Sequence, residues 1–311
     1  MKPFLLVLIV CANLSLHSIQ AQTPFNAFLE SSATYNKTRY SGVLIGTGLA
    51  YSVSMTLLYQ TWYKKFPKSK FHFFNDNGEW FQMDKLGHAT TAYNVAYGCY
   101  SLFRWSGKSN SQASWGGASV AMLFLTSIEV FDGFSDAWGF SWGDMAANVA
   151  GSALFAGQQL GYGEQKFSLK IGWNRSIYSE YRPDLLGENT AQQLLKDYNG
   201  QQIWLSCNIA SVLPVGKDFP KWLDIAAGQS VSGLLGAREN PELKDKYGKE
   251  IKFERRRRWF IGADVDFTRI PTNIPALPPA FQLINCFKIP SPSIEFSPKH
   301  KTRFNVFFVG P

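Results

Sequence analysis

The feature that most constrains the fold is a change of hydrophobic period near residue 161. Before it, apolar residues recur at helical spacing in long segments. After it, apolar residues alternate with smaller or polar ones: Phe167, Leu169, Ile171 and Trp173. A period near 3.6 is typical of helices, and a period of two is typical of strands with one apolar face. The order of the two patterns predicts an α+β protein, with a helical bundle at 40–162 followed by an antiparallel, strand-rich domain at 163–311.

The first 21 residues have the pattern of a secretory signal peptide. Lys2 precedes an apolar run over 3–14, and a more polar stretch ends in Ala21, a small residue suited to cleavage. Cys11 lies inside the apolar run and lacks the small preceding residue that a lipoprotein site favours. We therefore expect plain cleavage after Ala21, location in the cell envelope, and a polar entry segment at 22–39.

Four long helices are predicted in the bundle, which is expected to be membrane-associated. The first, over 42–63, carries no charge, ends in aromatic residues and is followed by lysines, which fits a membrane span. Because Ser, Thr and Gly interrupt it, a buried helix of a soluble bundle is the alternative. The others are expected at about 85–105, 114–130 and 142–160. The last carries small residues every fourth position, which lets a neighbouring helix approach closely: Gly143, Ala147 and Gly151.

Composition and charge favour an envelope protein over a cytosolic enzyme. Aromatic residues make up 15% of the chain and charged residues 17%, below the usual quarter. The formal net charge is +8, and its densest run is 255–258, four arginines. This run fits either phosphates of lipid headgroups or a solvated strand edge that charge keeps from aggregating. Export excludes nucleic acid, so the expected partner is a membrane or an envelope lipid or glycan.

Three cysteines follow the leader, an odd number without metal-ligand spacing. Cys99 lies in an apolar helical segment and is expected to be a small buried residue. Cys207 and Cys286 lie in strand-like stretches and are candidates for one disulfide in an oxidising compartment.

The candidate site is a set of polar residues at the ends of the predicted helices. Antiparallel helices with short connections bring the start of the second, the end of the third and the start of the fourth to one end of the bundle. Within each segment, spacings of three or four place side chains on one helix face. The predicted polar centre consists of Asp84, Lys85, His88, Glu129, Asp132, Ser141, Asp144 and Asn148.

Helix capping accounts for part of this set. Ser141 followed by Asp144 fits a capping box, and Asp84 can cap its own helix, each worth about 1 kcal/mol. Capping does not account for Glu129 and Asp132 at a helix C-terminus, where the helix dipole disfavours negative charge. Facing side chains or a bound cation must offset them. His88 is a central candidate, whereas Lys85 lies one position off that face and is expected to point outward.

A metal site is a second interpretation of the same residues. Carboxylates and one imidazole can hold a divalent metal ion, which would activate water against an ester or phosphoester. The alternatives are an ion-paired network that fixes the bundle, around a lipid headgroup for example, and a carboxylate acid/base role. The candidate metal ligands are Asp84, His88, Glu129, Asp132 and Asp144.

The order of these residues resembles a known family pattern: Asp84-Lys85-x-x-His88, Glu129-x-x-Asp132, then Trp138-Gly139-Phe140-Ser141-x-x-Asp144-x-x-x-Asn148-x-x-Gly151. It is similar to the YfiM-like family of predicted periplasmic lipoproteins of unknown function, and more distantly to the VanZ-like membrane proteins associated with glycopeptide resistance. The similarity covers about 80–163, and the stretches 181–187 and 196–206 resemble the longer, strand-tailed members. The chain differs from the lipoprotein members in its leader, and the resemblance implies no reaction.

Common enzyme motifs are missing from the sequence. It contains no GxxxxGK[ST] loop and no pair of CxxC motifs. We therefore predict an exported cell-envelope protein with a noncatalytic structural or lipid- or glycan-binding role centred on the polar cluster. The alternative is a membrane-associated, metal-dependent hydrolase of an envelope ester or phosphoester.

Overall fold

The computed structural model describes residues 28–64, 66–244, 247–298 and 300–306. The chain divides into two compact units, Met1–Glu30 and Ser31–Pro311, and the second unit holds all elements discussed below. The predicted leader at 1–21 lies outside the described residues.

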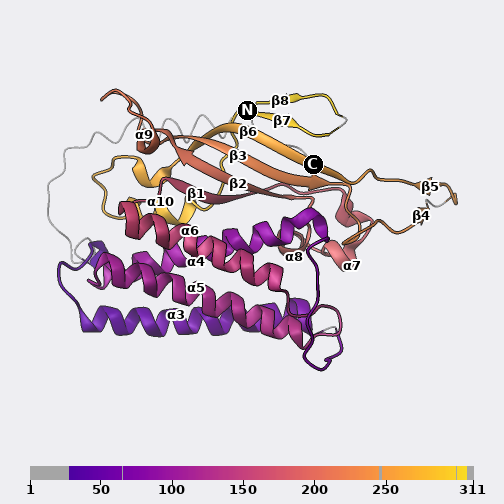
Figure 1. The fold of residues 1–311 in the computed structure, drawn as a ribbon, viewed down its shortest axis with the longest axis horizontal. Helices are drawn as coiled ribbons and strands as arrows, with labels where there is room; N and C mark the ends of the chain where they lie inside the picture. Colours follow the sequence, from indigo (N-terminus) through magenta and orange to yellow (C-terminus); the bar gives the residue numbers. More distant parts are fainter. Residues whose placement is uncertain (1–27, 65, 245–246, 299, 307–311) are drawn as a thin grey trace. The chain divides into compact units, whose positions relative to one another are not determined.

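Four long helices run side by side in the first half of this unit (Figure 1). Side chains at the N-caps fix where several of them begin: Asn36, Ser109 and Ser141 each accept a hydrogen bond from a backbone N–H in the first turn. The prediction that Asp84 caps the second helix is wrong, because Gln82 occupies the cap and Asp84 lies in the first turn. The helices are α3 (Lys37–Leu58, continued by η1, Tyr59–Tyr63), α4 (Met83–Trp105), α5 (Asn110–Gly133) and α6 (Trp142–Tyr162).

Three of the helices, α4, α5 and α6, pack closely because glycines face backbone at their crossings. A Cβ at Gly117 would lie 2.3 Å from the Ala96 carbonyl oxygen, and one at Gly151 would lie 2.0 Å from the Ala89 oxygen. α3 differs from them, since its buried residues are Val43 and Met55. Most of its apolar surface therefore has no partner within the described residues.

The second half of the chain forms a six-stranded antiparallel sheet in the order β1-β2-β3-β6-β7-β8. The strand expected from alternation at 167–173 is present, and the sheet is antiparallel as predicted. Two further strands, β4 (Leu243–Lys244) and β5 (Glu250–Ile251), form a separate hairpin. The main strands are β1 (Phe167–Trp173), β2 (Gln201–Asn208), β3 (Leu223–Ser232), β6 (Arg256–Val265), β7 (Ser293–Phe296) and β8 (Arg303–Asn305). Short helical segments join them: η3 (Tyr178–Glu180), α7 (Pro183–Leu186), α8 (Thr190–Lys196), α9 (Ile209–Val212), η4 (Phe267–Arg269) and α10 (Leu277–Ile284). Another short turn, η2 (Trp80–Gln82), directly precedes α4.

The two faces of the sheet have the opposite of the usual polarity. Directly paired residues share a face, so the register assigns each side chain to one of two sets. One set is largely polar and buried: Lys170, Ser206, Asp224, Ser230, Arg258, Asp264 and Glu295. The other set is apolar and, away from α4, exposed: Leu205, Ile225, Trp259, Ile261, Ile294, Phe296 and Phe304. We call these the inner and outer faces.

The sheet curls around its inner face. After α10 the chain runs beside β1, where Ile171 N donates to Cys286 O and Lys288 N donates to Ile171 O. The chain then reaches β6, where Ala263 N donates to Pro292 O. The curl brings β1 and β6 together, because Lys170 Nζ on β1 donates to Val265 O on β6 at 2.8 Å.

The proposed disulfide is not formed, since Cys207 and Cys286 are both free thiols. β1 lies between them: Cys207 is opposite Phe167, whereas Cys286 is hydrogen-bonded beside Ile171. Two strand spacings amount to about 10 Å, beyond the Cα separation of up to about 7 Å that a disulfide can bridge.

Helices and sheet share their hydrophobic core. Met83 at the start of α4 packs with Ile203 and Val231 of the sheet, and Tyr93 in the middle of α4 packs with Phe155 of α6. α4 therefore contacts both the sheet and other helices, and Figure 1 shows α4 and α6 near the sheet with α3 farthest from it. This placement joins the beginning of α4 to residues from both halves of the chain.

Candidate functional site

The polar centre lies where α4 and α6 begin and α5 ends, and Lys85 is at its middle. Lys85 Nζ is 2.6 Å from Asp76 Oδ1, 2.8 Å from Asp144 Oδ1 and 3.4 Å from Asp84 Oδ2. Its side chain is 14% exposed. The expectation that Lys85 points outward is wrong, because the three carboxylates surrounding it outweigh its position on the helix wheel.

His88 joins α4 to the other two helices. Its Nδ1 lies 3.0 Å from Asn148 Oδ1 and 3.6 Å from Glu129 Oε1, and its Nε2 lies 3.9 Å from Asp84 Oδ1. Glu129 and Asn148 are fully buried. The imidazole of α4 therefore contacts side chains of both α5 and α6.

Ser141 connects the cap of α6 to the rest of the centre. Its Oγ accepts from the Asp144 N–H at 3.1 Å and donates to Asp76 Oδ1 at 2.6 Å. Its backbone N–H donates to Glu129 Oε2 at 3.2 Å. Glu129 is thus held at its helix C-terminus by the first residue before the next helix, which partly offsets the unfavourable dipole there.

Two tyrosines that the sequence interpretation missed complete the arrangement. Tyr198, from the segment before β2, donates to Asp84 Oδ1 at 2.5 Å. Tyr63, at the end of η1, donates to Asp132 Oδ1 at 2.8 Å. Asp132 therefore lies one helical turn beyond Glu129 with its own partner, at the margin of the centre.

An unusual turn sets the direction of α4. Trp80, Phe81 and Gln82 have φ values of 48°, 51° and 60°, in the left-handed region that costs about 1–2 kcal/mol per residue. Trp80 N donates to Ala237 O at 2.8 Å, and Gln82 Oε1 accepts from Arg257 at 2.5 Å. The strand-rich half thus holds the turn that positions Asp84, Lys85 and His88.

The arginine run is used within the chain. Arg255 donates to the carbonyl oxygens of Gly236 and Ala237, Arg257 binds Gln82, and Arg258 forms a two-bond ion pair with Glu295. The interpretation as a solvated strand edge is wrong, because Arg258 is buried and Arg255 and Arg257 are hydrogen-bonded within the chain.

Two carboxylates in the segment before α4, Asp76 and Glu79, have pKa values shifted in opposite directions. Burial acts to raise the pKa of Asp76, but hydrogen bonds with Asp144, Lys85 and Ser141 outweigh it and hold this pKa below its usual value. For Glu79, burial prevails over the ion pair with Arg238, and its pKa is raised. Lys85 and Ser141 thus stabilise the ionised form of Asp76.

The structure brings most of the predicted site residues together. Asp84, Lys85, His88, Glu129, Ser141, Asp144 and Asn148 are linked by the contacts above, and Asp132 is adjacent. Asp76 was missed because it lies in a loop without helical spacing. One ligand atom each from Asp84, His88 and Asp144 lies within 4.8 Å of the other two, close enough to suggest a metal site.

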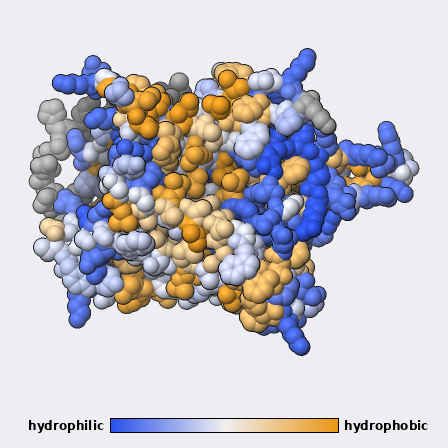
Figure 2. All heavy atoms as spheres, viewed as in Figure 1, coloured by the Kyte–Doolittle hydropathy of each residue, from blue (hydrophilic) through white to orange (hydrophobic). Residues whose placement is uncertain are grey.

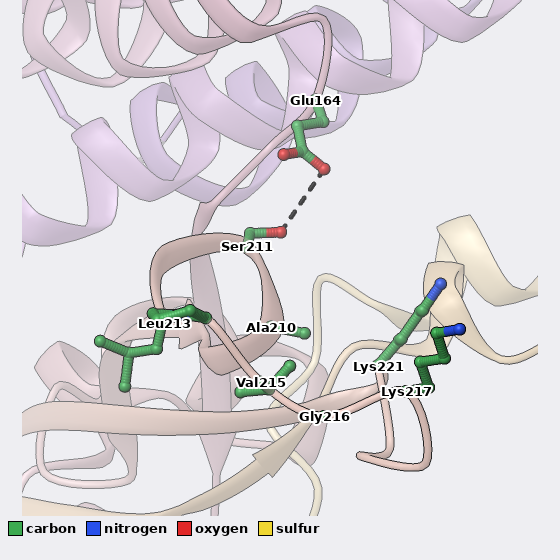
Figure 3. A pocket seen from close by; sticks show the side chains of 9 residues that line it. Glu164, Ala210, Ser211, Leu213, Val215, Gly216, Lys217 and Lys221 are labelled. Atoms are coloured by element: carbon green, nitrogen blue, oxygen red, sulfur yellow. Dashed lines mark hydrogen bonds between the residues drawn. The ribbon is translucent and has the colours of Figure 1, made fainter.

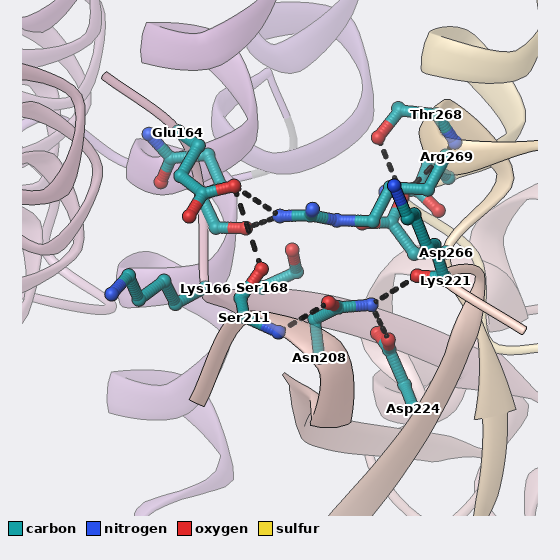
Figure 4. Close-up of polar contacts among 12 residues, drawn as sticks. Glu164, Lys166, Ser168, Asn208, Ser211, Lys221, Asp224, Asp266, Thr268 and Arg269 are labelled. Atoms are coloured by element: carbon teal, nitrogen blue, oxygen red, sulfur yellow. Dashed lines mark hydrogen bonds and ion pairs between the residues drawn. The ribbon is translucent and has the colours of Figure 1, made fainter. Parts of the chain in front are cut away.

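A separate pocket of about 530 Å³ lies beyond the other end of α6, past Gly163 (Figure 3). Lys217 and Lys221 extend on one side of it, away from Glu164 and Ser211. Its carboxylate is already used, since Glu164 Oε2 accepts from Arg269 at 3.0 Å and from Ser211 (Figure 4). The polar centre, with its buried and closely grouped carboxylates, is therefore the stronger candidate site.

Comparison with known proteins gives one family. The model of the family described as "Predicted periplasmic lipoprotein (DUF2279)" matches residues 72–157, which include Asp76 and the whole predicted polar centre. No curated protein and no solved structure matches the chain. The family's description agrees with the exported, cell-envelope location that the leader predicts.

Proposed function

We propose, from the similarity to predicted periplasmic lipoproteins, that this chain is an exported cell-envelope protein with a noncatalytic role, embedded in a lipid bilayer through its helices. The polar centre fixes the helices at one end of the embedded part. We also propose that the chain is related to the strand-tailed members of this family and, more distantly, to VanZ-like membrane proteins.

The observation that carries this proposal is the surface of α3. Residues 40–63 contain no charged side chain, and the region 37–63 is long and apolar enough to cross a membrane, with 11% of its apolar window buried. A core helix of a soluble protein would be mostly buried. Outward-facing apolar side chains along α3 instead have water or lipid as their neighbour: Leu44, Ile45, Leu49, Val53 and Leu57.

Charge placement on all four helices supports the same conclusion. Asp, Glu, Lys and Arg on α3, α4, α5 and α6 occur only near the helix ends. The helices have 22, 23, 24 and 21 residues, so each is about 32–36 Å long, comparable to a hydrocarbon core of about 30 Å. α5 also passes the length and composition test for a span.

The outer face of the sheet extends the apolar surface. Figure 2 shows apolar side chains gathered across the middle of this view, over strands and helices, with hydrophilic residues toward both ends. A polar interior beneath an apolar exterior is the arrangement that a lipid environment favours.

Substituting one exposed residue separates lipid from water as the neighbour of α3. In water, Leu49→Lys at a site already 62% exposed should be nearly neutral. In a bilayer, a lysine near the helix centre costs about 2.5–3.5 kcal/mol and should reduce membrane insertion. Gln60→Lys, on the same helix at its lysine-flanked end, is the matched control. We expect the natural protein and Gln60→Lys to resist extraction of membranes by alkaline carbonate, and Leu49→Lys to be released or lost. Release of the natural protein, or identical behaviour of all three, contradicts the proposal.

A second candidate is the membrane-associated hydrolase. The observation that favours it is that the centre is open on one side: the Asp84 side chain is 27% exposed and that of His88 is 15% exposed. A group outside the protein can therefore reach charged atoms. Turnover of a chromogenic phosphoester or ester by purified protein, abolished in Asp84→Asn, would favour the enzyme, whereas no turnover favours the noncatalytic role.

A further inference from the structure

The polar centre holds more negative than positive groups. Four carboxylates surround Lys85 and His88, and a fifth, Asp132, lies at the margin and accepts from Tyr63. An ionised carboxylate that is buried without a partner costs several kcal/mol. With all five carboxylates ionised and both cations present, three negative charges would remain, so protons or a bound cation must offset the difference. The carboxylates are Asp76, Asp84, Glu129, Asp132 and Asp144.

An independent observation comes from buried atoms that lack a partner. Glu129 is 0% exposed, and its Oε1 has no hydrogen-bond donor among the described residues. This atom points toward the His88 ring at 3.6 Å, into the centre. The other carboxylate oxygen of Glu129, Oε2, accepts from the Ser141 N–H. The atom without a donor is therefore Oε1, on the side that faces the imidazole.

The candidate ligand atoms have the separation that one ion requires. Ligand atoms about 2.0–2.4 Å from a metal ion lie about 3–4.8 Å from one another. The atoms of Asp84, His88 and Asp144 lie within 4.8 Å of one another, so small side-chain movements suffice. Lys85 retains Asp76, at 2.6 Å, when an ion takes the other two carboxylates.

We propose that the polar centre binds one divalent cation through Asp84, His88 and Asp144, with buried Glu129 supplying further negative charge. This deepens the proposed function by naming the ligand of the same centre. Two carboxylates and an imidazole suit Zn²⁺ or Mn²⁺ better than Ca²⁺ or Mg²⁺, which prefer oxygen ligands alone.

Calorimetric titration of Zn²⁺ and Mn²⁺ into chelator-treated, full-length protein in detergent tests this proposal. We expect one ion per chain and a higher midpoint of thermal unfolding when it binds. His88→Gln and Asp144→Asn should each weaken binding at least tenfold. Asp224→Asn, a buried carboxylate on the inner face of the sheet, is the matched control and should leave affinity unchanged.

The variants also keep the test falsifiable if one of them fails to fold. Asp144→Asn removes surplus charge, and His88→Gln keeps a polar side chain of similar size, so circular dichroism can identify a folded variant for comparison. Absence of binding by the folded natural protein, or equal affinity in a folded ligand variant, overturns the proposal. Because the titration is made in detergent, its outcome is separate from that of the membrane-extraction experiment.

Discussion

Two buried polar regions of this molecule differ in their balance of charge. On the inner face of the sheet, Lys170 and Lys288 face Asp264 at 3.0 and 3.5 Å, and Arg258 pairs with Glu295 at 2.7 Å. With Asp224, three cations meet three carboxylates there. In the polar centre of the helices, one lysine and one histidine meet four carboxylates, and a fifth, Asp132, lies at the margin.

The difference separates a structural network from a candidate binding site. A balanced buried network can stabilise its charges by itself, although its desolvation offsets much of the Coulombic gain. A centre with more carboxylates than cations must take up either protons or a cation. Burial alone would have ranked the two regions equally, and the count of charges distinguishes them.

The largest expected effect is the loss of Lys170. Lys170→Met removes a fully buried cation that contacts Asp264, Val265 O and Asn285, and should destabilise the fold by about 3–5 kcal/mol. Added Zn²⁺ should not restore the midpoint of thermal unfolding. Lys217→Met, at an exposed site, is the control. Restoration by the ion would mean that the inner face also binds cations, and the distinction between the two regions would fail.

A somewhat smaller effect is expected for Lys85. Lys85→Met leaves Asp76, Asp84 and Asp144 without their shared cation and should lower stability by about 2–4 kcal/mol, because the lysine is partly exposed. Here, Zn²⁺ should restore a substantial part of the loss, since the ion replaces the missing charge. The control Lys70→Met, at an exposed site, should change neither the stability nor its response to Zn²⁺. If Zn²⁺ does not restore the stability of Lys85→Met, the polar centre is a structural network like the inner face of the sheet, and the distinction between the two regions fails.

The smallest effect concerns pH and the inner face of the sheet. Burial, reinforced by Asp266, raises the pKa of Asp224 to about 6 against the opposing contacts of Asn208 and Lys170. Because the folded state then holds the proton more tightly, this contribution to stability is complete below about pH 4 and is lost as pH rises through 6.

Asp224→Asn should therefore be more stable than the natural protein by about 1–3 kcal/mol near pH 7.5 and equal to it near pH 4. Thermal unfolding followed at both pH values measures the difference. Equal stability of the two proteins at pH 7.5 would show that Ser206 and Asn208 fully stabilise the ionised carboxylate.

Local patterns in the sequence predicted much of the fold and part of the centre. Helical spacing located α4, α5 and α6, and alternation located β1, because these periods follow from backbone geometry. The spacing within each helix also identified His88 and Glu129 as facing groups.

Contacts between distant segments could not be predicted in this way. Tyr198 reaches Asp84 across 114 positions, and the loop that carries Asp76 is held by Arg238, which donates to Asn75 O across 163 positions. Lys85 was placed outward because its position was judged from its own helix alone. The inner and outer faces of the sheet could be assigned only once the strand register was known.

The bond from Tyr198 to Asp84 has a consequence for how the protein is made. Synthesis runs from the N-terminus, so α3 to α6 are complete before residue 198 is added. A nascent chain that stops at the end of the helices lacks both this tyrosine and the strand arginine that holds Gln82. The contacts of the polar centre are therefore complete only after β6 has been synthesised. A product truncated after the helices would lack the hydrogen bonds to Asp84 and Gln82.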